Sequence, residues 1–285
     1  MLRKGTFILM KTKIQDMTSG SPGRLIILFA IPLMLGNICQ QLYTMVDTMV
    51  VGQVAGVEAL AALGAVDFLM WVVTGISTGL TQGFSIQLSQ YYGAKDFENL
   101  RKSLAHSYRL TAFIAAGVLI LSQSFASLVL TGLHTPSNII GMSLLYLRII
   151  FCGIPATAAY NMFASALRAM GNSKTPLTAM IIASVLNVSL DILFVAGFGW
   201  GVAGAAIATV IAQSFSAVYC FLILRRIDIV HLTRADFMPA SGMNARLMKL
   251  GIPVVFQNII IGVGGLVVPV CGTHIRAHET AAKRV

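Results

Sequence analysis

LIILFAIPLMLGNICQQLYTMVDTMV, residues 25–50, decides how this chain can fold. Its only charged side chain is that of Asp47, and a helix of about 20 apolar residues is long enough to cross the hydrocarbon core of a bilayer. A strand is excluded in so long a run, because an open sheet edge in lipid leaves peptide groups without hydrogen-bond partners. The segment therefore predicts a transmembrane helix.

Six more apolar runs of similar length follow along the chain. They cover residues 59–83, 104–131, 139–163, 176–198, 202–224 and 250–271. Of the 285 residues, 56% are hydrophobic and 11% are charged, whereas a soluble domain carries about 25% charged residues. The surroundings of most side chains must be membrane lipid, and the sequence predicts an all-α integral membrane protein with six to seven transmembrane helices.

The net charge of +10 raises the question of a nucleic-acid partner. The basic residues, however, are concentrated in alternate loops between the apolar runs, which is the pattern of membrane topology. Fifteen of them lie before the first run or after the second, fourth and sixth runs, and none lies in the loops around 52–58, 131–137 and 197–201. We therefore expect no nucleic-acid partner, but a multi-pass protein of the cell (plasma) membrane with a cytoplasmic amino terminus.

The runs divide the chain into five parts. These are a cytoplasmic amino-terminal segment (1–23), a six-helix lobe (24–224), a cytoplasmic inter-lobe linker (225–249), the first helix of a second lobe (250–271) and a polar tail (272–285). The second lobe is inferred from a repeat, since the Ile-Pro-x4-Asn motif that begins at Ile31 recurs at Ile252, 221 residues later. Many transporters consist of two repeated bundles around a central site, although two apolar helices can also resemble each other by chance.

Polar side chains form a stripe along the first run. The stripe consists of Asn37, Gln40, Gln41, Thr44 and Asp47, at helical spacings of three and four residues. A charge in mid-membrane is costly, so it usually faces a cavity and has a function there. We expect the stripe to face a wet interior.

Two further runs carry polar groups at helical spacing. Asp191 lies one turn after Asn187, and Gln213 lies one turn after Thr209. A carboxylate in such an interior can bind a proton, or a sodium ion together with neutral oxygen donors. The alternative is that these groups only bond one helix to another, as Ser and Thr often do in membranes.

For Asp47 and Asp191 we favour the functional role over helix bonding. Asp67, in the 59–83 run, lies close to the end of its span, where it can also reach the water among the lipid headgroups. Both roles stay open for Asp67.

Pro32 lies inside the first run. Proline removes a backbone donor and clashes with the preceding turn, so the helix that carries Asp47 is expected to have a hinge. The alternative is a proline that is merely tolerated, which is common in membrane helices.

Cysteine and histidine side chains offer no recognisable metal or cofactor site. Each of the four cysteines lies inside an apolar run, there is no CxxC pair, and the five histidines lie in loops, near span ends or in the tail. We expect no cofactor besides a coupling ion, H⁺ or Na⁺, and no enzyme activity.

Several short motifs occur together in the first six runs and the loops between them. They are FAIP (29–32), QQLY (40–43) with Asp47, ALAALG (59–64), YYGAKD (91–96), LRAMGNSKTP (167–176), and Asn187-x3-Asp191 followed by GVAGAAIAT (201–209). In this highly specific combination the chain resembles the multidrug and toxic compound extrusion (MATE) family from about residue 17 to residue 268. The resemblance implies twelve helices in two six-helix lobes, exporting small cationic or amphipathic compounds in exchange for H⁺ or Na⁺.

The resemblance also implies roles for individual residues. The cation site of the amino lobe maps onto Asp47, Asn187, Asp191 and Thr209, where Na⁺ is the candidate metal. The first-helix proline, proposed to bend as that site changes occupancy, maps onto Pro32. The residues expected to line the cavity are Asn37, Gln40, Gln41, Tyr43, Thr44 and Gln213.

The chain departs from the family pattern in its last part. Some branches have a glutamate in the seventh helix, and residues 251–270 contain none, so coupling would rest on the amino lobe. The match ends after Val268, and five helices of the family pattern are missing. We therefore expect a truncated or frameshifted chain that inserts in the membrane but exports nothing by itself, unless a complementing second lobe is its partner.

Other functions stay open on the sequence. A flippase for lipid-linked oligosaccharides, from the same superfamily, would need many cationic residues in its cavity, whereas only Arg148 lies well inside a span. From other classes, the chain could be a non-functional membrane fragment or a membrane-embedded enzyme, although an enzyme would need a nucleophile with a base or clustered metal ligands.

Overall fold

A computed structural model describes the backbone of residues 21–238 and 240–282, with side chains up to residue 262 except that of Pro22. Most of the predicted amino-terminal segment (1–23), and the side chains of the predicted polar tail (272–285), lie outside these described residues.

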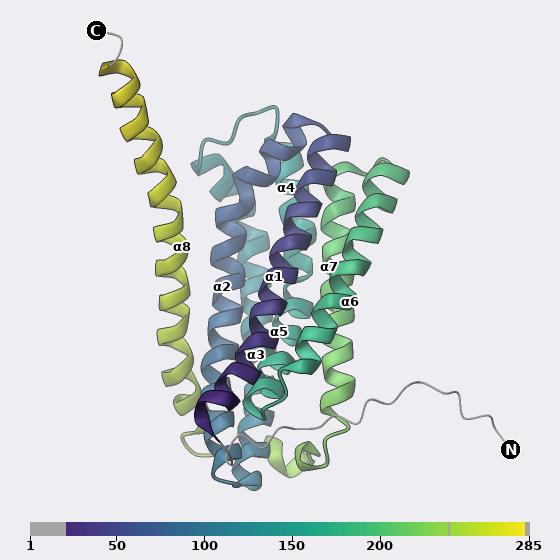
Figure 1. Ribbon diagram of the computed structural model, residues 1–285, viewed down its shortest axis with the longest axis vertical. Helices are drawn as coiled ribbons and strands as arrows, with labels where there is room; N and C mark the ends of the chain where they lie inside the picture. Colours follow the sequence, from purple (N-terminus) through teal and green to yellow (C-terminus); the bar gives the residue numbers. More distant parts are fainter. Residues whose placement is uncertain (1–20, 239, 283–285) are drawn as a thin grey trace, which may run out of the picture.

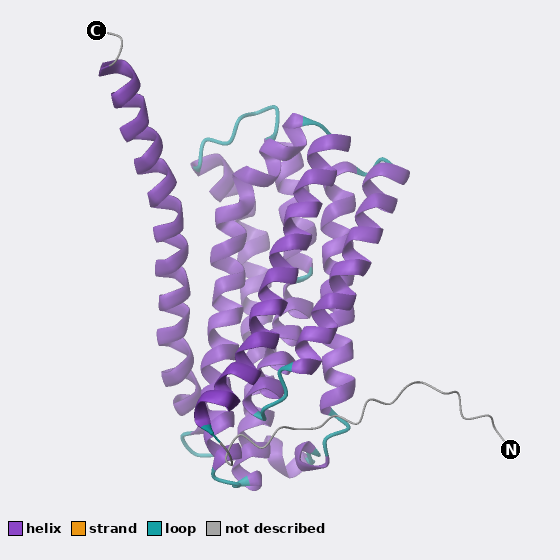
Figure 2. Ribbon diagram, in the orientation of Figure 1, coloured by secondary structure: helices purple, strands orange, loops and turns teal. Residues whose placement is uncertain are grey.

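The described part of the chain is a bundle of long helices without a strand (Figures 1 and 2). Its elements are α1 (Pro22–Val54), α2 (Val57–Gly93), α3 (Phe97–Gly132), α4 (Ile140–Cys152), α5 (Ile154–Ala169), α6 (Lys174–Asp191), the π-helical η1 (Ile192–Gly197), α7 (Gly201–Leu224), the 3₁₀ turns η2 (Asp228–Val230) and η3 (Arg234–Phe237), and α8 (Met243–Ala282). Six helices are long and apolar enough to cross a membrane, or seven if α4 and α5 form one bent span. The prediction of an all-α membrane protein with six to seven spans is confirmed.

The expected single span over 139–163 is broken in the structure. α4 ends before Gly153, α5 begins after it, and their axes differ by 46°. A Cβ on Gly153 would lie 2.6 Å from a methyl group of Val210 in α7, so the close approach of α7 requires glycine here. Pro155 then occupies the first turn of α5, where its missing N–H is not needed. The two residues together explain a bend that hydropathy does not reveal.

The span predicted over 176–198 is regular only in its first part. After Asp191 the α-helix widens into the π-helical turn η1, where the Phe198 N–H donates to the Leu193 carbonyl at 2.9 Å. Such π turns are rare and often lie at functional sites.

α1 packs against α6 and α2 and continues through Pro32 without interruption. The ring of Pro32 leaves the carbonyl of Leu28 without its intrahelical donor, which is the local weakness expected of a hinge. Bending at this point stays a prediction. Large apolar side chains along α1, among them Met34 and Leu42, are exposed on the bundle surface, as expected for a helix that meets lipid or further protein.

The turn between α2 and α3 is fixed by Asp96. Its carboxylate accepts hydrogen bonds from the Asn99 backbone N–H at 3.1 Å and from the Asn99 side-chain amide at 2.7 Å, and so caps α3. These bonds, first that from the side chain, lower the pKa of Asp96 below its ordinary value, because they favour the charged form.

α8 begins earlier than the 250–271 run suggested. Gly242 adopts a φ of +76°, which suits glycine, and the helix starts at Met243. Figure 1 shows α8 beside α2 near the α2–α3 turn and diverging from the bundle toward its other end. The expected linker is thus shorter than 225–249 and contains two 3₁₀ turns.

Candidate cation-binding site

The carboxyl group of Asp47 lies inside the lobe. The residue is 6% exposed, and its Oδ1 atom is buried without a hydrogen-bond partner in the described part of the chain. An unpaired buried charge is costly, and a proton, a bound cation or an ordered water would each reduce that cost.

α6 contributes a second carboxyl group and a neutral oxygen, one helical turn apart. Asp191 is 0% exposed, and neither of its carboxyl oxygens has a hydrogen-bond partner among the described residues. The same holds for the Oδ1 atom of Asn187, which is 1% exposed. Asp191 is the last α-helical residue before the π turn η1, so the irregular turn lies directly beside the carboxyl group.

α7 completes the group from the opposite side. The Asn187 Nδ2 atom donates to the Thr209 hydroxyl at 3.4 Å, and the Gln213 side-chain amide donates to the Tyr43 hydroxyl at 3.4 Å. A pocket lies between these helices. Its lining residues are Tyr43, Met180, Ala183, Asn187, Thr209, Ala212 and Gln213.

The two carboxyl groups lie on neighbouring helices, because α1 packs against α6. No ion pair of the described residues includes either aspartate. Of the residues mapped to a cation site, Asn187 and Asp191 thus lie one turn apart on α6, Thr209 of α7 is bonded to Asn187, and Asp47 lies on the α1 helix that packs against α6.

The rest of the first-run stripe is arranged differently. Asn37, Gln40, Gln41 and Thr44 are exposed, so the described helices do not enclose them, and Thr44 donates to the Gln40 carbonyl at 3.0 Å. The ten residues from Asn37 to Asp47 make about 2.8 helical turns, which rotates Asp47 by about 80° relative to Asn37. Gln40, however, is exposed and lies only about 20° from Asp47 around the helix, so burial changes along α1 and not around it. As cavity-lining residues, these four remain predictions.

Asp67 is exposed in the described part of the chain, ten residues after the start of α2. Such exposure fits both a carboxylate that reaches water and one that has a function, so both roles of Asp67 stay open. Tyr146, a buried residue of α4, was not singled out from the sequence, because a lone tyrosine in an apolar run is more often packing than function.

The MatE family model matches residues 32–193, which run from Pro32 within α1 to just past the end of α6 and include three of the four mapped residues. The chain belongs to the MatE family. This is a family of transporters, and the match is consistent with the all-α, multi-pass membrane fold.

Relatives of this MatE chain include proteins named for drug resistance. A probable multidrug resistance protein, YpnP, of Bacillus subtilis is 31% identical over 278 residues, 96% of this chain and 62% of that protein. The multidrug export protein MepA of Staphylococcus aureus (strain NCTC 8325) is 23% identical over 84% of this chain and 53% of its own length. The MatE chain thus spans about three fifths or less of these relatives.

Solved structures match the MatE chain over most of its length. A multidrug resistance MATE family transporter in an outward-facing conformation aligns with a TM-score of 0.83 and 25% identity over 90% of this chain and 57% of that one. An inward-facing conformation aligns with a TM-score of 0.73 and 23% identity. Both matches show that the MatE chain has the helix arrangement of these transporters over the part that it covers, little more than half of each structure.

Proposed function

We propose that this chain carries the coupling-ion site of a transporter that exports small cationic or amphipathic compounds in exchange for H⁺ or Na⁺. The observation that carries the proposal is the pair of buried carboxyl groups of Asp47 and Asp191, because the Oδ1 atom of Asp47 and both oxygens of Asp191 are buried without a hydrogen-bond partner among the described residues. The names of the relatives support the transported class.

The chemistry of the group suits a small hard cation or a proton. Its free atoms are oxygens: carboxyl oxygens of both aspartates and the amide oxygen of Asn187. Oxygen ligands suit hard cations such as Na⁺, and the Thr209 hydroxyl next to Asn187 adds a neutral oxygen donor. A proton on either aspartate would relieve the same unpaired charge.

The occupancy of this group can be linked to the shape of α1. Asp47 and Pro32 lie on one helix, so a change in the charge state at Asp47 alters how strongly α1 is held against α6. The weak point at Pro32 is where the helix can respond. Transport would use this response to alternate the access of the drug site.

The proposed topology places the amino terminus and the α2–α3 turn in the cytoplasm of the cell membrane. The excess of Lys and Arg in the loops on that side supports this orientation. The oligosaccharide-flippase alternative gains no support, since the residues that line the pocket beside Asn187 are all uncharged.

The test is ion binding by the purified chain in lipid nanodiscs. We expect saturable binding of radioactive ²²Na⁺, or an infrared C=O band of protonated carboxyl groups that disappears as the pH rises. Either signal should be lost in Asp191→Asn and kept in Asp67→Asn, a matched change at an exposed carboxylate. Absence of both signals in the unaltered chain would overturn the proposal.

A further inference from the structure

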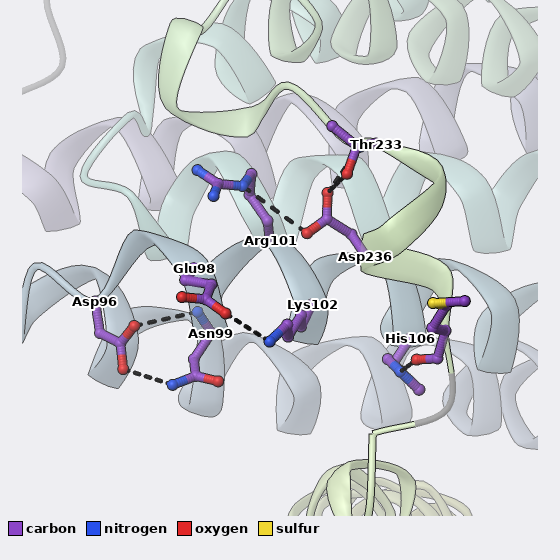
Figure 3. A network of polar contacts seen from close by, with 9 residues as sticks. Asp96, Glu98, Asn99, Arg101, Lys102, His106, Thr233 and Asp236 are labelled. Carbon is purple, nitrogen blue, oxygen red and sulfur yellow. Dashed lines mark hydrogen bonds and ion pairs between the residues drawn. The ribbon is translucent and has the colours of Figure 1, made fainter.

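The connection between α7 and α8 is attached to the bundle through a buried histidine of α3. His106 is 1% exposed, and its Nε2 atom lies 3.0 Å from the carbonyl oxygen of Met238 in the connection. Its Nδ1 atom lies 2.7 Å from the Oδ1 atom of Asn244, in the first turn of α8. One side chain therefore contacts both the connection and the helix that follows it (Figure 3 shows His106 beside the connection).

The hydrogen-bond roles follow from the chemistry of the ring. A carbonyl oxygen only accepts, so the His106 Nε2–H donates to Met238. In the neutral ring Nδ1 then accepts, so the Asn244 side-chain amide, turned over, presents its NH₂ group to Nδ1, and the Arg109 guanidinium is a second donor at 3.2 Å. Arg109 also donates to the Phe237 carbonyl at 3.3 Å, so two side chains of α3 hold successive carbonyls of the connection.

A second attachment lies at the other side of η3. Asp236 is 5% exposed and accepts from the Thr233 backbone N–H at 2.7 Å and from the Thr233 hydroxyl at 2.8 Å, which closes this 3₁₀ turn. Its other oxygen lies 3.9 Å from the Arg101 Nε atom of α3 (Figure 3). The connection is thus a structured turn tied to α3 at two points one or two helical turns apart.

α2 holds the start of α8 from a third direction. The Gln87 side-chain amide lies within hydrogen-bond distance of the Met243 sulfur, at 3.1 Å, and of the Tyr91 hydroxyl, at 3.3 Å. Leu247, one turn into α8, is 0% exposed. A Cβ added to Gly83 of α2 would overlap the backbone of Gly251, so the two helices approach backbone to backbone next to these contacts.

We propose that His106 is a positioning residue that fixes the first turn of α8 on the lobe formed by α1 to α7. The connection then acts as a rigid strap that sets where α8 starts along α2 and so prevents it from sliding. From this start α8 stays against α2 as far as Gly262, where an added Cβ would lie 2.5 Å from the Trp71 ring, and Figure 1 shows it diverging from the bundle toward its far end. A role of this attachment in alternating access rests on the proposed function. The fixed position of the first turn of α8 does not depend on that function.

The test is the distance between α8 and α3 in the 285-residue chain. Spin labels are placed on cysteines introduced at Phe113 and Ile260, which are 71% and 67% exposed, in a background without native cysteines. We expect one narrow distance distribution in the unaltered background. His106→Phe keeps an aromatic ring but removes both contacts, and should at least double the width of the distribution.

Two variants serve as controls. His106→Gln keeps an N–H that can reach the Met238 carbonyl and should restore much of the narrow distribution. His231→Phe makes the same substitution at an exposed histidine of the same connection, whose neighbour is Asp228, and should change nothing. If His106→Phe does not fold, Asn244→Leu removes the contact from the α8 side and should broaden the distribution in the same way.

The outcomes separate this inference from the transport proposal. A broad distribution in the unaltered chain, or equal widths for His106→Phe and His231→Phe, would overturn the positioning role. Neither result depends on ion binding, which is measured on the same samples with ²²Na⁺. Loss of ion binding in the unaltered chain would count against the transport proposal alone.

Discussion

The side-chain amide of Asn187 donates to the hydroxyl of Thr209 across the interface of α6 and α7, at 3.4 Å. The bond leaves the Asn187 Oδ1 atom free and buried, one helical turn from the carboxyl group of Asp191. The bond thus fixes the Asn187 amide so that its oxygen is available to a ligand beside Asp191. Thr209 is the residue through which this orientation can be tested.

Thr209→Val replaces the hydroxyl by a methyl group of nearly the same size. We expect Na⁺ binding to weaken about tenfold, which corresponds to about 1.4 kcal/mol, because the amide of Asn187 loses its anchor and the site loses an oxygen. Thr209→Ser keeps the hydroxyl and should bind nearly as well as the unaltered chain. Equal affinities for the valine and serine variants would show that Thr209 only packs α7 against α6.

Asp47→Asn removes a buried carboxyl group that lacks a protein donor. In Na⁺-free buffer at alkaline pH the variant should be more stable than the unaltered chain, by about 1–3 kcal/mol, because no unpaired charge has to be buried. Addition of Na⁺ should then raise the thermal midpoint of the unaltered chain but not that of Asp47→Asn.

The exposed carboxylate of Asp67 provides the control for this change. Asp67→Asn should keep the stabilisation by Na⁺ in full. If Na⁺ still raises the thermal midpoint of Asp47→Asn, Asp47 does not bind the ion. This conclusion would hold even if the variant exports less.

Acid should weaken the cap of α3. The pKa of Asp96 is lower in the folded chain than in the unfolded chain, mainly because of the hydrogen bond from the Asn99 side chain. The charged cap therefore contributes its full stabilisation at a pH above the unfolded-state pKa of Asp96. This stabilisation is lost as the pH falls through the folded-state pKa. Asp96→Asn keeps an acceptor at the cap but does not titrate. The unaltered chain should therefore lose more of its thermal stability than Asp96→Asn between about pH 5 and pH 3. Parallel losses in the two proteins would contradict a charged cap.

The spans could be predicted from the sequence because lipid imposes one requirement on every helix, a run of about 20 apolar residues. The bend at Gly153 could not, because glycine and proline are frequent in membrane helices and only the methyl groups of Val210 show why this glycine is needed. The early start of α8 was missed for a related reason. Residues 243–249 are polar enough to read as a loop, and contacts with Gln87 and His106 make them helical.

The candidate site was predictable only where spacing and family motif agreed. Asn187 and Asp191 lie on one face by spacing alone, and the structure buries both. Asp47 was grouped with Asn37 and Gln40 by a spacing that gives the helix face but not the packing along the helix, and Asp47 is buried whereas Gln40, about 20° away on the same face, is exposed. The π turn after Asp191 has no sequence signal that we could use.

Pro32→Ala restores the hydrogen bond to the Leu28 carbonyl. One such bond contributes about 1 kcal/mol, so amide exchange of the surrounding turn in α1 should slow about fivefold, and export by a functional transporter should slow with it. Pro155→Ala is the matched control, because Pro155 lies in the first turn of α5, where an added N–H completes no intrahelical bond. Unchanged exchange around residue 32 would show that the proline does not weaken α1.

Close packing of α2 on α8 should depend on single glycines. A Cβ added to Gly79 would lie 2.7 Å from the Cα atom of Val255, which is backbone and cannot move aside as a side chain can. Gly79→Ala should therefore push α8 away and destabilise its attachment by about 1–3 kcal/mol, the usual cost of overpacking. Gly64→Ala, on the same helix with nothing within 4 Å of the added Cβ, should instead be neutral or stabilising by up to about 1 kcal/mol.

Comparing the two alanine variants distinguishes the effect of alanine on the helix propensity of α2 from its effect on the contact between α2 and α8. Both replace a glycine of α2 by alanine, so any general effect on α2 appears in both. The readouts are the denaturant midpoint of the whole chain and the distance between spin labels at Phe113 and Ile260. Because the strap at His106 holds the first turn of α8, Gly79→Ala should tilt the helix beyond that turn and lengthen the distance without releasing its start. A distance in Gly79→Ala equal to that in Gly64→Ala would mean that α8 does not rest on α2 at Gly79, and that the strap alone positions it.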